Sequence, residues 1–228
     1  MYRNKTVSAV IPCYNEEEGI RYVIERMPPF VDEIVVVDNN STDRTGEVAR
    51  SLGAAVVLEK RKGYGRAYKT GIPAAKSEII VTLDGDGSYP LEEIGPLIDH
   101  LLDRKLDFVS ASRFPLQKRG SMQSMNRLGN WVLTAATFLL FFRSIRDSQS
   151  GMWAFYASAY PGIAPASDGM AFSEELKIEA MLAKNVRFGE YHIDYHARIG
   201  EVKLNMWKDG IDNLLFLVRR RFGGRGGA

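Results

Sequence analysis

The stretch Ile79-Ile-Val-Thr-Leu-Asp84-Gly85-Asp86-Gly87-Ser88-Tyr89-Pro90 carries an apolar, β-branched run straight into two aspartates one residue apart. In an open α/β sheet, ligands bind at the carboxyl ends of the strands. Carboxylates at positions i and i+2 can reach one hard cation, and Mg²⁺ or Mn²⁺ favours oxygen ligands that it shares with phosphate. The stretch therefore predicts a divalent-metal site for a nucleotide diphosphate. An Asp-Gly turn that closes a hairpin is the alternative.

Strand-like and helix-like segments alternate on both sides of this stretch. The expected strands lie at 6–11, 33–38, 54–58, 79–83 and 107–111, and helices at 16–27, up to 52, up to 71 and 91–102. Pro12 is expected to end the first strand. This alternation predicts an α/β fold with a Rossmann-like, mostly parallel sheet covered by helices on both faces.

The alternation changes after Ser112. The segments expected there are a basic helical region at 113–146, a short strand at 151–156, a helix at 172–184, a strand at 188–197 and a terminal amphipathic helix at 207–222. No linker separates these segments from the first half. We therefore expect a single domain over 1–222 and a disordered tail at 223–228.

Composition excludes few partners. The 228 residues carry a net charge of +2, which gives no reason to expect a nucleic acid. Cys13 is the single cysteine, so no disulfide can form within the chain, as is usual in a reducing compartment. No signal peptide is apparent at the N-terminus, and no apolar run reaches the roughly 20 residues needed to cross a bilayer.

Three further groups of residues end in, or follow, a predicted strand. Pro12 and Tyr14 can form the wall of a base pocket, and Glu16 can accept a hydrogen bond from the base. Asp38, at the end of the second strand, can hold a ribose hydroxyl or a base edge. A plain strand-to-helix turn and a capping role for Asp38 are the alternatives.

The loop Lys60-Arg-Lys-Gly63-Tyr-Gly65-Arg66 combines cations, glycines and the start of a helix, which suits an anion. It is neither a Walker loop nor a dinucleotide fingerprint, so it indicates neither NTP hydrolysis nor a dinucleotide cofactor. A solvated basic loop is the alternative.

Taken together, the motifs resemble one large family of inverting glycosyltransferases with the GT-A fold, which includes dolichyl-phosphate mannose synthase and polyprenyl-phosphate glucosyltransferases. The resemblance covers roughly residues 5 to 208. It is carried, in order, by Ile11-Pro-x-Tyr-Asn-Glu16, Val37-Asp38-x-x-Ser-x-Asp-x-Thr45, Gly63-x-Gly-x-Ala67, Asp84-x-Asp86, Ser112-Arg113, Ser150-Gly151 and Arg198-x-Gly200-x-x-Lys203.

The resemblance implies a division of labour along the chain. Residues 5–112 would bind the nucleotide sugar and residues 113–208 the acceptor. Asp84 and Asp86 would hold Mg²⁺ or Mn²⁺, while Gly85 lines the site and Ser88 stands where relatives often have glutamine. Asn39 likewise stands where many relatives carry a second acid. Arg198 and Lys203 could fold over the diphosphate.

The acceptor expected from the resemblance is a polyprenyl phosphate, whose anionic oxygen needs cations rather than a general base. Family resemblance places Arg113 and Arg127 at the acceptor phosphate, and we add Arg119 because of its charge and proximity. By the same resemblance Asp147 and Glu175 would face the sugar. A helix-surface role is the alternative for Glu175.

The apolar segment Trp131–Phe142 has basic residues on both sides. Its ordinary interpretation is a buried core helix, but such a segment beside a phosphate site also fits an interfacial helix. The basic run at 219–221 could form a second contact with anionic lipid. The expected location is therefore the cytoplasmic face of a membrane, with peripheral attachment.

Two rival functions remain open from the sequence. A glycosyltransferase with a hydroxyl acceptor in polysaccharide or glycan synthesis would need a base, and Asp147 or Glu175 would supply it. A non-catalytic membrane adaptor could keep the fold. His192, Asp194 and His196 alternate as metal ligands would, although a polar strand face is the favoured interpretation.

Overall fold

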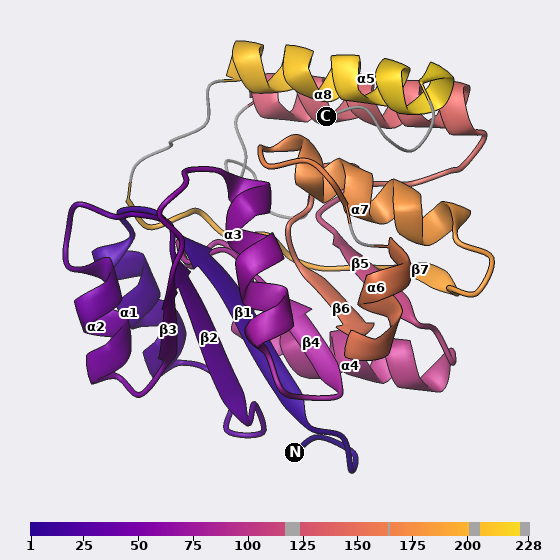
Figure 1. Cartoon of the computed structure of the whole chain (residues 1–228). Helices are drawn as coiled ribbons and strands as arrows, with labels where there is room; N and C mark the ends of the chain where they lie inside the picture. The colour runs from indigo at the N-terminus through magenta and orange to yellow at the C-terminus, as the bar shows by residue number, and fades with distance from the viewer. Residues whose placement is uncertain (117–123, 164, 201–205, 224–228) are drawn as a thin grey trace.

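A seven-stranded mixed sheet forms the centre of the molecule (Figure 1). The computed structural model describes residues 1–116, 124–163, 165–200 and 206–223. The strand order is β3-β2-β1-β4-β6-β5-β7, and within it only β6 runs antiparallel to its neighbours. The strands are β1 (Val7–Cys13), β2 (Glu33–Asp38), β3 (Ala55–Leu58), β4 (Ile79–Thr82), β5 (Phe108–Ser112), β6 (Trp153–Tyr156) and β7 (Phe188–His192).

Pro12 does not end the first strand, contrary to the expectation from sequence. Strand β1 continues to Cys13, and both residues pair with β2. The carbonyl of Cys13 faces β2, where it accepts the Asn39 N–H, so the Pro12 nitrogen points toward β4. The pairing with β4 ends at Val10, and the missing N–H of Pro12 therefore costs no ladder hydrogen bond.

Helices cover both faces of the sheet, as the alternation predicted. One face packs against α1 (Glu17–Glu25), α2 (Thr45–Ser51) and α4 (Ile94–Asp103). The opposite face packs against α3 (Tyr64–Gly71), α6 (Tyr160–Ile163) and α7 (Ala171–Leu182). Each face has its own apolar core, which explains why the central strands are apolar on both sides.

Two long helices, α5 (Ser124–Phe141) and α8 (Met206–Phe222), form a further layer that packs on α7 (Figure 1). The basic region 113–146 is therefore helical only in part, because residues 113–116 continue from β5 in non-helical form. The strand expected at 188–197 also ends early, at His192. Beyond it, the chain turns toward the end of β4, where the N–H of His196 donates to the Ser88 carbonyl.

This extra layer buries charged residues of α7 that a surface helix would expose. The Thr137 hydroxyl of α5 contacts a Glu174 carboxylate oxygen at 3.0 Å, and Lys177 Nζ donates to the Ser150 carbonyl at 2.8 Å. Burial raises the pKa of Glu174 to about 8. Burial also lowers the pKa of Lys177 to about 7, since it disfavours the charged form of each group.

The Glu174→Gln variant should lose most of the pH dependence that Glu174 gives to folding. Because the folded-state pKa lies above the unfolded value near 4.5, the contribution is fully present below pH 4.5 and is lost as pH rises through about 8. Glutamine mimics the protonated acid. Between pH 5 and pH 8.5, urea unfolding should therefore show that the wild type loses about 2 kcal/mol or more relative to the variant.

Both proteins retain Lys177, so the effect of its titration largely cancels in this comparison. Equal changes in the free energy of unfolding for the two proteins would show that Glu174 is ionised throughout this range.

Candidate active site

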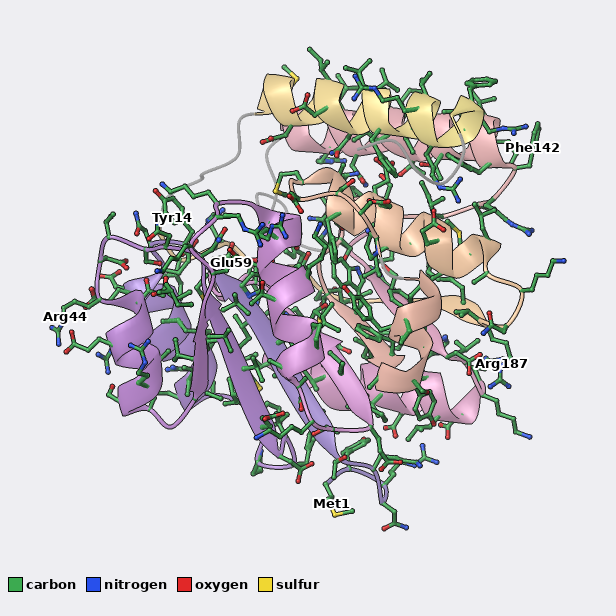
Figure 2. All side chains as sticks on the ribbon, viewed as in Figure 1. Met1, Tyr14, Arg44, Glu59, Phe142 and Arg187 are labelled. Carbon is green, nitrogen blue, oxygen red and sulfur yellow. The ribbon has the colours of Figure 1, made fainter. Side chains whose placement is uncertain are left out.

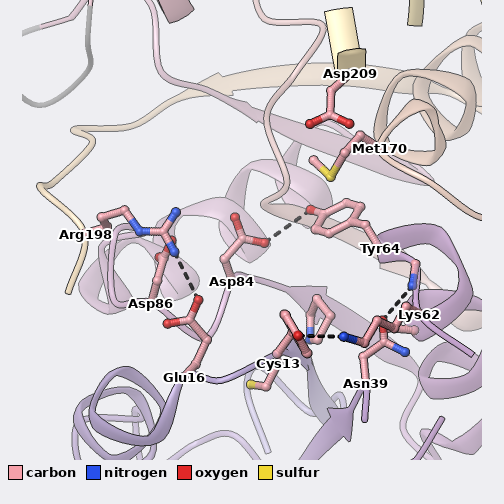
Figure 3. A pocket seen from close by; sticks show the side chains of 15 residues that line it. Cys13, Glu16, Asn39, Lys62, Tyr64, Asp84, Asp86, Met170, Arg198 and Asp209 are labelled. Carbon is pink, nitrogen blue, oxygen red and sulfur yellow. Dashed lines mark hydrogen bonds and ion pairs between the residues drawn. The ribbon is translucent and has the colours of Figure 1, made fainter. Parts of the chain in front are cut away.

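A pocket with a volume of about 320 Å³ opens where the carboxyl ends of the parallel strands β1, β2 and β4 meet α3 (Figure 3). This is the edge at which the sequence predicted a ligand site. Eight of the residues predicted as site residues line the pocket: Pro12, Tyr14, Glu16, Gly63, Asp84, Gly85, Asp86 and Arg198.

Asp84 and Asp86 both face this pocket from the loop that follows β4. The Tyr64 hydroxyl donates to Asp84 Oδ1 at 3.2 Å, and the backbone N–H of Ser88 donates to Asp86 Oδ1 at 2.9 Å. Burial, together with the neighbouring Asp86 charge, raises the pKa of Asp84 to about 7. The two carboxylates therefore concentrate negative charge in a poorly solvated place.

The donor set at this loop fits a hard divalent cation. Among the described residues, no group of three or more His, Cys, Asp or Glu side chains is arranged to hold a metal alone. Mg²⁺ and Mn²⁺ are commonly held by one or two carboxylates, with substrate phosphates and waters as the other ligands. Asp84 and Asp86 supply two such carboxylates. Ser88 is fully buried beside them, and its predicted role as a ligand stays a prediction.

Arg198 lies beside this carboxylate pair. Its Nη2 atom lies 3.0 Å from Glu16 Oε1 and 3.3 Å from Asp86 Oδ2. The sequence placed Glu16 at the base and Arg198 at the diphosphate, so the direct contact between them was not expected.

The side of the pocket that contains Tyr14 and Lys62 is built on an asparagine that sequence reasoning did not select as a site residue. The Asn39 amide donates to the carbonyls of Glu59 and Arg61, at 3.0 and 2.7 Å, and its oxygen accepts the Gly63 N–H at 2.8 Å. Asn39 thereby fixes the basic glycine loop. From that loop, Lys62 Nζ lies 2.6 Å from the Tyr14 hydroxyl and 4.3 Å from its ring centroid.

Two residues predicted to bind the nucleotide lie outside this lining. The Asp38 carboxylate accepts the Ser41 N–H at 2.9 Å, which is the capping role that the sequence left open. The Arg66 guanidinium pairs with Asp168 at 2.8 Å. Lys203, the third cation predicted near the diphosphate, lies outside the described residues.

Arg113 and Asp147, predicted for the acceptor and the sugar, form one buried ion pair. Arg113 Nε and Nη2 donate to the two Asp147 carboxylate oxygens at 2.7 and 2.8 Å, and the Arg113 backbone N–H adds a third bond at 3.0 Å. Burial opposes the charge on Asp147, but the Arg113 guanidinium outweighs it and holds the pKa of the Asp147 carboxyl below its usual value. Asp147 is therefore an ionised partner of Arg113.

The remaining predicted residues are dispersed. Both Glu175 oxygens accept backbone N–H groups, from Ala166 at 3.1 Å and Ser167 at 2.8 Å, so this carboxylate holds a loop. Arg127 lines a second hollow of about 470 Å³, which also contains Phe114, Trp131 and Arg146. Arg119 lies outside the described residues.

Sequence reasoning missed five lining residues that bear on chemistry or shape: Asn39, Lys62, Tyr64, Met170 and Asp209. Lys62 and Tyr64 belong to the basic glycine loop, so their signal was visible but not assigned to single residues. Met170 and Asp209 come from distant parts of the chain, and no local pattern singles them out.

Fold and site together define an α/β protein with a carboxylate pair in a pocket at one sheet edge. A family model described as Glycosyl transferase family 2 matches residues 8–160. The chain belongs to this family. The family and fold class expected from the sequence are thereby confirmed.

Curated relatives extend over most of the chain. A dolichyl-phosphate hexose transferase of Haloferax volcanii is 32% identical over 213 residues, covering 92% of this chain and 91% of the relative. The low-salt glycan biosynthesis hexosyltransferase Agl6 of the same organism is 33% identical over 220 residues. That match covers 93% of this chain but 53% of Agl6, so the chain spans about half the length of this relative.

Solved structures agree on the fold. Glucosyl-3-phosphoglycerate synthase from Mycobacterium tuberculosis, in complex with Mn²⁺, UDP and phosphoglyceric acid, has a TM-score of 0.76 at 21% identity. The match covers 99% of this chain and 81% of that chain.

Proposed function

We propose that the protein transfers a hexose from a UDP- or GDP-linked sugar to a polyprenyl phosphate, with a divalent cation and with inversion. The observation that carries the proposal is the placement of Asp84 and Asp86 in a pocket that also holds Tyr14, Lys62 and Arg198. Carboxylates for a metal, an aromatic wall for a base and cations for phosphates meet there. The relative named for dolichyl phosphate supports the acceptor.

The donor would bind with its base against Pro12 and Tyr14 and its diphosphate near the end of β4. A divalent cation bound to Asp84 and Asp86 would neutralise the charge that develops on the leaving diphosphate. An acceptor phosphate oxygen would attack the anomeric carbon from the opposite side. The bond to the diphosphate breaks as the new one forms, so the configuration inverts and the nucleoside diphosphate leaves.

A phosphate acceptor, which needs no general base, is consistent with the interactions of the two candidate base carboxylates. An alcohol acceptor needs a general base, and the two candidates from the sequence are engaged elsewhere. Asp147 is paired with Arg113, and Glu175 holds the backbone of Ala166 and Ser167. A hydroxyl-acceptor mechanism could use Asp209, an acid that lines the pocket from α8.

The second hollow offers the cations that a phosphate acceptor requires. Arg127 from α5 and Arg146 from the segment before β6 both line it, with Trp131 and Phe114 beside them. The chain connects this hollow to the buried Arg113–Asp147 ion pair, since Phe114 follows Arg113 and Arg146 precedes Asp147. A site with arginines and aromatic rings suits a phosphate attached to an apolar chain.

An exposed apolar surface on α5 and α8 supports contact with a membrane. Trp131, Leu139 and Phe142 are 68%, 70% and 74% exposed on or just after α5. The larger set comprises Leu128, Trp131, Val132, Phe138, Leu139 and Phe142, with Ile211, Leu214, Leu215, Val218 and Phe222 on or near α8. Figure 2 shows side chains of this outer layer that project away from the sheet, with Phe142 at the edge of the layer.

None of the described helices is both long and apolar enough to cross a bilayer. The proposed contact is therefore with the surface of the membrane, through partial burial of this face in the interfacial region. Arg219 and Arg221 are exposed beside it, whereas Arg220 pairs with Glu179, so two of the three basic residues are available to anionic lipid.

A non-catalytic membrane adaptor, the other alternative, would not need two carboxylates so close together. Asp84 and Asp86 repel each other, and a protein without catalysis would gain stability by losing one of them.

The Asp86→Asn variant should lose transfer by about 100-fold or more, because the diphosphate would lose most of its bound counter-ion. The measurement is transfer of radiolabelled hexose from UDP- and GDP-hexoses to short-chain polyprenyl phosphate, with Mg²⁺ or Mn²⁺. Asp194→Asn, at an acid that is 46% exposed and outside the pocket lining, is the matched control and should retain full activity. Full activity of Asp86→Asn in excess EDTA would overturn the metal assignment.

The triple variant Phe138→Ser, Leu139→Ser, Phe142→Ser should bind anionic liposomes at least about 100-fold more weakly. Full burial of each apolar side chain contributes on the order of 1.5–3 kcal/mol, and partial burial at the interface contributes less. Phe141 is left intact because it packs against the small core between α5, α7 and α8. Flotation of wild type and variant on vesicles with and without anionic lipid measures the effect.

Leu58→Ser, on the edge strand β3, removes a comparably exposed apolar side chain at 51% and should change nothing. Wild-type protein that ignores vesicles of every composition would refute the membrane contact.

A further inference from the structure

One arginine neutralises the most crowded group of carboxylates in the pocket. Arg198 Nη2 contacts Glu16 Oε1 at 3.0 Å and Asp86 Oδ2 at 3.3 Å, and Asp84 lies alongside (Figure 3). Glu16 comes from the loop after β1 and Asp86 from the loop after β4, so the guanidinium bridges two loops of the same sheet edge.

The backbone around Arg198 is fixed to the same loop. The Ile199 N–H donates to the Asp86 carbonyl at 2.8 Å, and the His196 N–H donates to the Ser88 carbonyl at 3.0 Å. Gly200 follows with φ of +84°, a conformation that favours glycine. The segment is thus held by backbone hydrogen bonds that do not involve the Arg198 side chain.

At least one N–H donor of the Arg198 guanidinium group makes no hydrogen bond within the described part of the chain. Within the described part of the chain, the buried Nε–H of Arg198 has no acceptor. The side chain is 23% exposed, so part of it faces the open pocket. A guanidinium carries five N–H donors that match phosphate oxygens in pairs. A bound diphosphate would satisfy donors that the two carboxylates leave free.

We propose that Arg198 is the resident counter-ion of Glu16 and Asp86 in the metal-free protein, and that it exchanges Asp86 for the diphosphate when a divalent cation binds. Glu16 is then a positioning residue, which holds Arg198 at the pocket rather than binding the base itself. The inference rests on the proposed function, because it assigns an order to the cations of that same site.

The exchange predicts opposite changes in metal affinity and nucleotide affinity when Arg198 is replaced, which a purely structural role does not. Arg198 and a divalent cation compete for Asp86, so removing the guanidinium should strengthen metal binding in the absence of nucleotide. The same change removes a diphosphate ligand, so it should weaken nucleotide binding once the metal is saturating. Coupling between two ligands of one site commonly amounts to about 5–150-fold.

The experiment measures two affinities in wild type and in Arg198→Gln. Mn²⁺ binding without nucleotide is followed by the electron paramagnetic resonance signal of free Mn²⁺, and UDP and GDP binding at saturating Mn²⁺ by calorimetry. For Arg198→Gln we expect Mn²⁺ affinity to rise by about fivefold and nucleotide affinity to fall by about tenfold.

Lys62→Gln is the matched control for charge. Lys62 lines the same pocket, but it contacts the Tyr14 hydroxyl rather than a carboxylate of the pair. Its loss should change nucleotide-free Mn²⁺ affinity by no more than about twofold. An equal rise in both variants would mean that Arg198 acts only through its general charge, and the exchange would be refuted.

A double-mutant cycle tests the role of Glu16. If Glu16 positions Arg198, then Glu16→Gln weakens nucleotide binding in the wild-type background and has no further effect in Arg198→Gln. An effect that persists in the Arg198→Gln background would assign Glu16 to the base and overturn the positioning role.

The other possible outcomes also test the exchange. Loss of both affinities in a folded Arg198→Gln protein would show that Arg198 only maintains the loop. If that variant does not fold, Arg198→Lys keeps the charge with fewer donors. It should then show near wild-type Mn²⁺ affinity and weakened nucleotide binding, and any other pattern refutes the exchange. Failure of the wild type to bind Mn²⁺ or either nucleotide would refute the proposed function itself.

Discussion

Repulsion between two neighbouring carboxylates at the end of β4 is the constraint on which the site depends. Asp84 and Asp86 are held close by a glycine-rich loop, and burial with mutual repulsion shifts the Asp84 pKa to about 7. Such a pair is stabilised by protonation of one carboxyl group or by nearby cations. Arg198 contacts Asp86 directly, and the pocket is open to a divalent cation and a polyanion. The donor site is therefore arranged around the balance of these charges.

The back of the site is fixed by a fully buried network of polar groups. The Ser150 carbonyl accepts hydrogen bonds from Lys177 Nζ, the Ser173 hydroxyl and the Trp153 indole, at 2.8, 2.8 and 2.9 Å. Gly151 follows, and a Cβ there would lie 2.4 Å from the Tyr64 hydroxyl and 3.3 Å from Asp84 Oδ1. A side chain at this position would displace the Tyr64 ring, whose hydroxyl donates to Asp84. The layer formed by α5 and α8 buries this network and also presents the exposed apolar face.

Local patterns predicted the first half of the fold and the edge where the site lies. β-Branched runs set β1 to β5 to within about two residues, and the residues at the strand ends do meet in one pocket. The relation between distant segments was not predictable in this way. The insertion of β6 between β4 and β5 depends on pairing across more than 40 residues, and nothing in its four residues specifies a neighbour.

The partners of buried charged residues were likewise not predictable from the sequence. Arg113 and Asp147 each fitted a separate role, and only the folded chain shows that they neutralise each other. The sequence left a helix-surface role open for Glu175, which the fold buries, because tertiary burial leaves no local trace in the α7 sequence. Tertiary burial decides such cases, and the periodicity of a single helix does not report it.

The most direct test of the account is the chemical nature of the acceptor. Transfer from UDP- and GDP-hexoses is measured with a short-chain polyprenyl phosphate and with the same polyprenol lacking phosphate. The account predicts product only from the phosphate, with a KM that rises by about tenfold in Arg127→Gln and is unchanged in the nearby exposed Arg143→Gln. Comparable transfer to the free alcohol, dependent on Asp209, would contradict it.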